Sequence, residues 1–194
     1  MLTRQVVRVA VFFAVSAAIV WLSWRSLRSL RSHGFYRFFA FELLLALILQ
    51  NVPIWFRDPF SMRQWASYTL GLVSMALAAE GFRLLHVIGK PAEASQVARR
   101  PVSDTNLAFE NTTQLVTVGA YRLIRHPLYA SLLALAWCAY FKDPRGGITM
   151  GLTLGATAFL IATAIAEERE NAARFGEPYA AYRKRTWRFV PFLF

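Results

Sequence analysis

The chain has 194 residues, enough for about one domain, and 56% of them are hydrophobic. This composition excludes a disordered chain, and the single cysteine excludes a disulfide framework or a thiolate zinc cluster. The formal net charge of +11 suits either nucleic acid or an anionic membrane surface. Because the arginines cluster between long apolar stretches, the membrane is favoured and no nucleic-acid partner is expected.

Five apolar stretches follow one another along the chain, at residues 6–24, 36–56, 64–88, 127–141 and 146–166. A bilayer core of about 30 Å needs roughly 20 helical residues, so all but the fourth are long enough to cross it. The fourth is predicted to be a short helix that pairs with the fifth through a turn at residues 142–147. The predicted fold class is therefore all-α, a polytopic membrane bundle of about five transmembrane helices.

The predicted organisation is one domain in three parts. Residues 1–88 hold three N-terminal transmembrane helices, and residues 89–126 form a cytoplasmic loop. Residues 127–194 form the helical hairpin together with a cytoplasmic, partly helical C-terminal segment, whose apolar end from Phe189 is expected to dock again at the membrane face. The first apolar stretch could also be a cleaved signal peptide, but it continues beyond its small residues to Trp24, which favours a retained helix.

Basic residues are distributed unevenly over the predicted loops. Most of the 22 Lys and Arg residues lie in residues 25–37, 89–126 and 167–194, which this arrangement places on one side of the membrane. The positive-inside rule puts that side in the cytoplasm. We therefore expect a multi-pass protein of a bacterial cytoplasmic (inner) membrane, with its C-terminal segment inside.

Two polar groups flank the predicted hairpin. Arg125 and His126 precede the fourth apolar stretch, where Pro127 suits the first helical turn, and Glu167 and Glu168 follow the fifth. The free ends of a helical hairpin lie at the same membrane face, so the sequence predicts that the two groups meet at the mouth of the bundle.

This mouth is predicted to suit a small zwitterion. The first helical turn and Arg125 favour an anion, whereas Glu167 and Glu168 could hold an ammonium group or sugar hydroxyls. Tyr129 lies about one turn into the helix, near His126. The alternative is that Arg125 and His126 are interfacial anchors and the two glutamates only a solvated helix end.

Several ordered motifs resemble the isoprenylcysteine carboxyl methyltransferase family, which belongs with phospholipid N-methyltransferases to a broader group. They are Leu-Val-Thr-Val-Gly-Ala-Tyr at residues 115–121, Arg-His-Pro-Leu-Tyr at 125–129, Glu167-Glu168, and the run from Phe175 through Tyr179 and Tyr182, followed by Pro191. The resemblance covers residues 109–191, about two fifths of the chain. Ser131 departs from the pattern, since the family often has glycine there.

The resemblance implies an integral membrane enzyme that transfers a methyl group from S-adenosylmethionine to a lipophilic acceptor, either a prenylcysteine-like carboxylate or a lipid head group. It implies Arg125 as the residue nearest the acceptor and Glu167 as the acidic contact of the cofactor. It also implies cofactor contacts or cover from His126, Pro127, Tyr129, Tyr121, Tyr179 and Tyr182. The expected partners are this lipophilic or lipidated acceptor and membrane lipids.

The chemistry of methyl transfer agrees with the residues present. In-line displacement at a sulfonium needs alignment more than covalent help, and no metal-ligand spacing is recognisable among the three histidines and one cysteine. An ionised carboxylate acceptor needs no base, whereas an amine acceptor needs one, such as Glu168 or His126. Arg125 and Glu168 are therefore the predicted catalytic residues, and the acceptor class stays open.

Two other functions remain open at this stage. One is an NADPH-dependent membrane reductase of sterol-like lipids, and the other is a non-catalytic membrane scaffold that keeps the hairpin.

A few other residues are weaker candidates for a structural or functional role. They are a Glu80–Arg83 pair within one helix, Glu42 with Gln50 and Asn51 pairing with neighbouring helices, and Cys138 as an inert buried thiol. Polar residues of the long loop could line the entrance to the site; these are Asp104, Asn106, Glu110 and Asn111.

Overall fold

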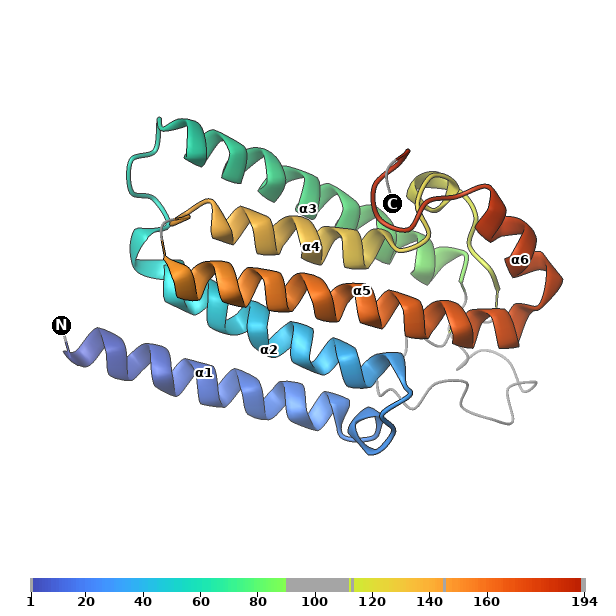
Figure 1. Ribbon diagram of the computed structural model, residues 1–194, viewed down its shortest axis with the longest axis horizontal. Helices are drawn as coiled ribbons and strands as arrows, with labels where there is room; N and C mark the ends of the chain where they lie inside the picture. Colours follow the sequence, from blue (N-terminus) through green and yellow to red (C-terminus); the bar gives the residue numbers. More distant parts are fainter. Residues whose placement is uncertain (1, 90–111, 113, 145, 193–194) are drawn as a thin grey trace.

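The computed structural model describes residues 2–89, 112, 114–144 and 146–192. Its main elements lie side by side in an all-helical bundle (Figure 1). In chain order they are α1 (Leu2–Ser23), α2 (His33–Asn51), α3 (Met62–Val87), α4 (Pro127–Tyr140), α5 (Gly147–Phe175) and the short α6 (Glu177–Lys184). The predicted fold class is confirmed: α1, α2, α3 and α5 are long and apolar enough to cross a membrane, and α4 is the shorter apolar helix.

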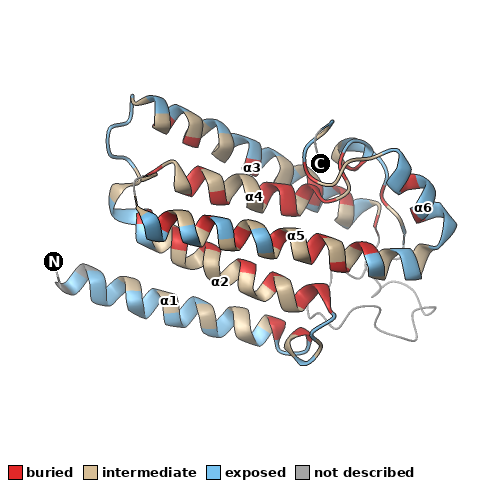
Figure 2. Cartoon of the chain, viewed as in Figure 1, coloured by how far each residue is buried: buried red, intermediate tan, exposed pale blue. Residues whose placement is uncertain are grey.

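The chain reverses between successive helices, so α2 and α4 begin at the end of the bundle where α3 and α5 finish (Figure 1). We call this the site end. α2 packs mainly on α5 and α3 on α4, while α1 lies along α2 at the edge. Figure 2 shows α1 exposed over most of its length and α4 buried among its neighbours. The helix that the sequence predicts to be shortest is therefore central.

Polar side chains of α2 bond to neighbouring helices, as the sequence predicts. Ser16 of α1 donates a hydrogen bond to Glu42 at 2.9 Å. Gln50 donates to Thr149 of α5 at 3.2 Å, and Asn51 donates to the Ala139 carbonyl of α4 at 3.0 Å. Each bond satisfies a polar group inside an apolar helix, where an unpaired one would be costly.

The opposite end of the bundle is held by a buried lysine. Lys142 is 1% exposed, and its Nζ donates to Gln64 Oε1 at 2.8 Å. The same Nζ lies 5.0 Å from the ring centre of Trp55 and 4.5 Å from that of Tyr68. Cation–π contacts gain strength when they are desolvated, so this lysine ties α3 to the α4–α5 connection.

Lys142→Ala should lower the stability of the purified protein by about 2 kcal/mol, because it removes a desolvated cation and takes the Lys142 donor away from the buried Gln64 Oε1. Thermal unfolding in detergent measures this loss. Lys184→Ala on the exposed end of α6 is the matched control and should leave the melting temperature unchanged. Equal melting temperatures for the two variants would contradict the structural role of Lys142.

Candidate functional site

The backbone around Arg125 and His126 is fixed by the C-terminal segment. Ile124 and Trp187 form a parallel bridge, and the N–H groups of Arg125 and His126 donate to the carbonyls of Trp187 and Arg188. Phe189 is buried in the core beside them, so the chain packs on the bundle at this residue. The start of α4 is therefore held by residues that lie about 60 positions later in the sequence.

A short 3-10 helix before α4, η5 (Gly119–Arg122), positions Tyr121. Glu80 of α3 accepts a hydrogen bond from the Ala120 N–H at 3.0 Å. Gly119 has a φ of 58°, and a Cβ atom there would collide with the Glu80 carboxylate, so the position requires glycine. The expected pair with Arg83 is not among the interactions of the described residues; Glu80 instead anchors this turn.

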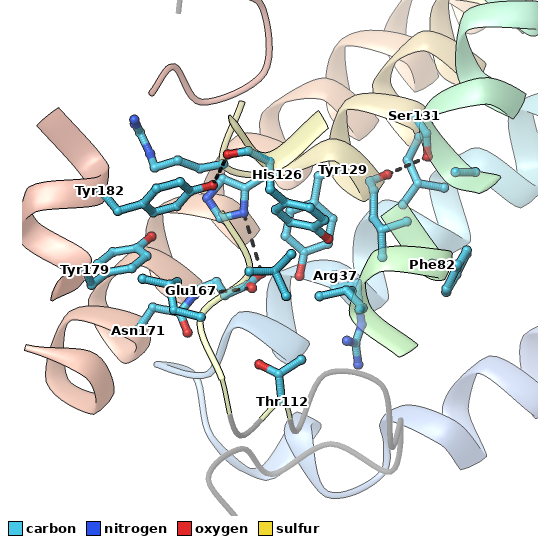
Figure 3. A pocket seen from close by; sticks show the side chains of 18 of the residues that line it. Arg37, Phe82, Thr112, His126, Tyr129, Ser131, Glu167, Asn171, Tyr179 and Tyr182 are labelled. Atoms are coloured by element: carbon cyan, nitrogen blue, oxygen red, sulfur yellow. Dashed lines mark hydrogen bonds and ion pairs between the residues drawn. The ribbon is translucent and has the colours of Figure 1, made fainter. Parts of the chain in front are cut away.

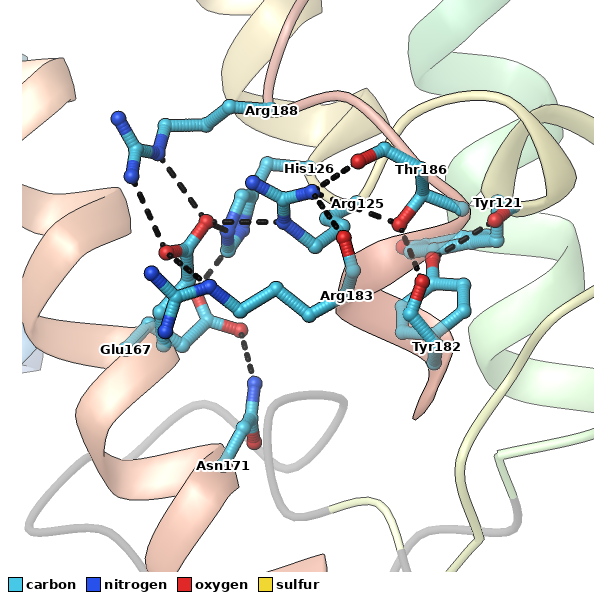
Figure 4. Close-up of polar contacts among 10 residues, drawn as sticks. Tyr121, Arg125, His126, Glu167, Asn171, Tyr182, Arg183, Thr186 and Arg188 are labelled. Atoms are coloured by element: carbon cyan, nitrogen blue, oxygen red, sulfur yellow. Dashed lines mark hydrogen bonds and ion pairs between the residues drawn. The ribbon is translucent and has the colours of Figure 1, made fainter. Parts of the chain in front are cut away.

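The two ends of the α4–α5 hairpin meet, as the sequence predicts. His126 Nδ1 lies 3.8 Å from Glu167 Oε2, and His126 Nε2 lies 3.5 Å from Glu168 Oε1. Arg125 Nε donates to Glu168 Oε1 at 2.9 Å (Figure 4). The imidazole, the guanidinium and both carboxylates therefore form one cluster at the site end of the bundle.

Within this cluster, Glu168 forms ion pairs with arginines. Its side chain is 4% exposed, and its carboxylate accepts a hydrogen bond from Arg125. Arg188 donates two more, from Nε to Oε1 at 3.0 Å and from Nη2 to Oε2 at 3.1 Å. Arg183 Nε lies 3.8 Å from Oε2. Arg125 also donates to the carbonyls of Thr186 and Arg183. Because buried charges are stable only when paired, Glu168 and Arg125 fasten the C-terminal segment to α4 and α5.

Glu167 faces a cavity of about 280 Å³ instead (Figure 3). Its side chain is 29% exposed, and Asn171, one turn later on α5, lies 3.5 Å from its Oε1. Tyr129 of α4 stacks on His126, with ring centres 5.5 Å apart. This polar end of the cavity brings together a carboxylate, an amide, an imidazole and phenols.

Helix α6 covers the polar end. Gly176, between α5 and α6, adopts φ 58° and ψ −132°, a conformation that essentially only glycine tolerates. The turn brings Tyr179 and Tyr182 over the cavity, and the Tyr182 hydroxyl donates to the Tyr121 carbonyl at 2.7 Å. Burial raises the pKa of the Tyr179 and Tyr182 phenols, so both remain neutral hydroxyl groups.

The other half of the cavity is apolar and runs between α2, α3 and α4. It is lined there by Phe41, Ser74, Ala78, Phe82, Leu128, Ser131, Leu132 and Leu135. We call this half the apolar arm. The cavity is therefore amphipathic, with ionisable groups near the end of the bundle and hydrocarbon walls deeper within it.

Arg37 of α2 lies between these halves. It is 1% exposed and lines the cavity one helical turn after His33. His33 Nδ1 lies 2.6 Å from Glu170 Oε2 of α5, and the His33 N–H donates to the same carboxylate at 2.9 Å. This pair holds the start of α2 against α5. It therefore also fixes the position of Arg37, one turn later, along the cavity wall.

The structure places most of the predicted site residues around this one cavity. Those that line it are Tyr121, Arg125, His126, Tyr129, Glu167, Tyr179 and Tyr182. Pro127 and Glu168 are not lining residues: Pro127 is buried at the α3–α4 contact beside Gly81, and Glu168 faces the arginines. The candidates Asp104, Asn106, Glu110 and Asn111 lie outside the described residues.

Sequence reasoning missed Arg37 and Asn171 as cavity residues. Arg37 lies near the start of its helix, and in the sequence it belongs to the basic segment 25–37 that marks the membrane face. A guanidinium inside an apolar helix is itself an indication of a site. Asn171 lies four residues after Glu167, so the helical period places both side chains on one face.

In comparisons with known proteins, no protein-family profile, no curated protein and no solved structure matches the chain. The resemblance to the methyltransferase family therefore stays a prediction from the sequence motifs.

Glu168→Gln should destabilise the protein by about 3 kcal/mol, since it leaves the buried guanidinium groups without their counter-charge. Glu167→Gln should cost much less, because Glu167 faces the cavity and is partly exposed. Thermal unfolding gives the stabilities, and amide hydrogen exchange at residues 123–126 and 186–189 shows whether the C-terminal segment has loosened. If the two variants lose equal stability and exchange alike, the fastening role of Glu168 is wrong.

Proposed function

We propose that the protein is an integral membrane methyltransferase that uses S-adenosylmethionine and modifies a lipophilic acceptor. The observation that carries the proposal is the amphipathic cavity: its polar end holds Glu167, Asn171, His126 and Tyr179, and its apolar arm continues between the helices. A water-soluble cofactor and a lipid-soluble acceptor would meet where these halves join. The motifs that resemble the methyltransferase family supply three of these four polar residues: Glu167, His126 and Tyr179.

The distribution of basic residues supports a cytoplasmic position for this site. Among the described residues, the arginines of residues 25–37, 122–125 and 169–188 lie at the site end, while fewer basic residues, such as Arg57 and Lys142, lie at the other. By the positive-inside rule the cofactor would enter from the cytoplasm. The proposed location is a bacterial inner membrane.

The residues present fit the cofactor. The Tyr179 hydroxyl oxygen is buried near Asn171 and makes no well-formed hydrogen bond among the described residues, so it can accept or donate one to a ligand. Glu167 would hold the ammonium group or ribose hydroxyls, and His126 and Tyr129 would pack beside it. When bound, S-adenosylmethionine supplies a methyl group on a sulfonium that is open to in-line attack.

The protein's own contribution is alignment and exclusion of water. Tyr179 and Tyr182 of α6 cover the polar end, and the hairpin fixes His126 and Glu167 relative to each other. Such positioning can supply much of the rate enhancement of a displacement. Arg125 acts by holding this arrangement, because its guanidinium is bonded to Glu168 and to the C-terminal backbone.

The pairing of Glu168 bears on the acceptor. A carboxylate that is bonded to Arg125 and Arg188 is a poor proton acceptor. A carboxylate acceptor would need no base, while an amine acceptor would depend on His126, which lines the cavity.

The purified protein in detergent should bind S-adenosylhomocysteine, and Glu167→Ala should abolish that binding because the acidic contact is lost. Isothermal titration measures the affinity. Glu177→Ala, an exposed glutamate at the start of α6, is the matched control and should bind like the wild type. Absence of binding by the wild type would refute the proposal.

The same preparation distinguishes the other functions. Stabilisation against heat by NADPH and not by S-adenosylhomocysteine would favour the lipid reductase. Stabilisation by neither would favour a non-catalytic scaffold. Incubation with labelled S-adenosylmethionine and a membrane lipid extract should place the label on a lipophilic product in the wild type only, and not in Glu167→Ala.

A further inference from the structure

The residues that line the apolar arm reach as deep as Ser74 on α3 and Leu135 on α4, and no deeper on these two helices. At Gly71 of α3 an added Cβ atom would lie 3.4 Å from Cys138 Sγ of α4, and Ser67 Oγ donates to the Cys138 carbonyl at 2.8 Å. The two helices are therefore in direct contact at this level, and neither Gly71 nor Cys138 lines the cavity. We call this contact the floor. It also confirms that Cys138 is buried.

On the α3 side, the arm is lined by two small side chains and, nearer the mouth, by Phe82. Ser74 and Ala78 lie between the floor and the mouth and both line the cavity. At Gly81 the helices close again, because an added Cβ atom would lie 2.8 Å from Leu128 Cδ2. The space available to an apolar group therefore runs along α4 from Leu128 to Leu135 and stops at the floor.

The helical rise converts this span into a length. Leu128 and Leu135 are seven residues apart, about 10 Å along the axis at 1.5 Å per residue. An extended hydrocarbon with C–C bonds of about 1.5 Å advances about 1.3 Å per carbon, so the arm accommodates about eight carbons. About two more carbons would connect this part of the tail to a reacting group at the polar end, which gives a tail of about ten carbons. The walls are aliphatic or aromatic apart from the hydroxyls of Ser74 and Ser131.

We propose that the Gly71–Cys138 floor sets the length of the acceptor's tail, so that the acceptor is a single-tailed amphiphile with about ten carbons in its tail and not a two-tailed phospholipid. This inference rests on the proposed methyltransferase function and narrows its substrate class. It assigns the specificity to α3, a helix in which the sequence shows no motif of the family.

The test measures methyl transfer from labelled S-adenosylmethionine to two ladders of acceptors with tails of 6, 10, 14 and 18 carbons. N-acetyl-S-alkyl-cysteines present a carboxylate, and alkyl phosphoethanolamines present an amine. We expect kcat/KM to be highest at ten carbons in whichever ladder reacts, and at least tenfold lower at 18. Ala78→Phe should lower kcat/KM for the ten-carbon acceptor at least tenfold while the six-carbon acceptor still reacts.

Ala79→Phe is the matched control, because residue 79 is the next position on α3 and is exposed. It should leave the whole ladder unchanged. Leu135→Ala should move the tail length with the highest kcat/KM toward 14 carbons, because it enlarges the arm. This variant therefore tests the length limit without inserting a bulky side chain. All three variants should keep the wild-type affinity for S-adenosylhomocysteine.

Three results would overturn the length limit: kcat/KM that stays level or rises up to 18 carbons, equal effects of Ala78→Phe and Ala79→Phe, or no transfer to either ladder by a protein that binds S-adenosylhomocysteine. Failure of the wild type to bind S-adenosylhomocysteine is a different outcome, since it removes the methyltransferase function itself.

Discussion

The arrangement of the site depends on one buried carboxylate. Glu168 is almost inaccessible to solvent, yet it carries charge because Arg125 and Arg188 donate hydrogen bonds to it from two other parts of the chain. Taking these charges out of water is costly, and only their close pairing offsets that cost. The pairing therefore fixes the end of α5, the start of α4 and the C-terminal segment relative to one another.

Once Glu168 is fixed, its neighbour Glu167 is directed elsewhere. Successive residues on a helix point about 100° apart, so a glutamate that faces the arginines leaves the preceding one facing the cavity. Two adjacent residues of the same type thus have different surroundings: Glu168 holds the structure, and Glu167 is available to a ligand beside His126. The apolar arm below them adds a second environment within the same cavity.

The sequence predicted the helices and the meeting of the hairpin ends, because both follow from simple geometry. Apolar stretches of known length must cross a bilayer, and the ends of a hairpin must lie together, so His126 and Glu167 could be placed before the structure was known. Tyr179 and Tyr182 also line the cavity, although only the resemblance to the family's motifs indicated them as site residues.

Other features depend on contacts between distant residues and are not visible in a local pattern. Apart from the family resemblance, nothing in the sequence distinguishes Glu167 from Glu168. Nothing in it predicts that Glu80 bonds to the Ala120 backbone or that Arg37 lines the cavity. The floor of the apolar arm is a further case, since Gly71 and Cys138 are ordinary helix residues whose importance arises from the packing of α3 on α4. Such pairings require the three-dimensional structure.

Photo-crosslinking with an azido derivative of S-adenosylmethionine tests the central claim most directly, because it reports both binding and place. The account predicts that the label is found on peptides containing residues 121–129 or 167–182, and that excess S-adenosylhomocysteine prevents it. Label that excess S-adenosylhomocysteine does not prevent, or label on α1 or at the end of the bundle that holds Lys142, would contradict it.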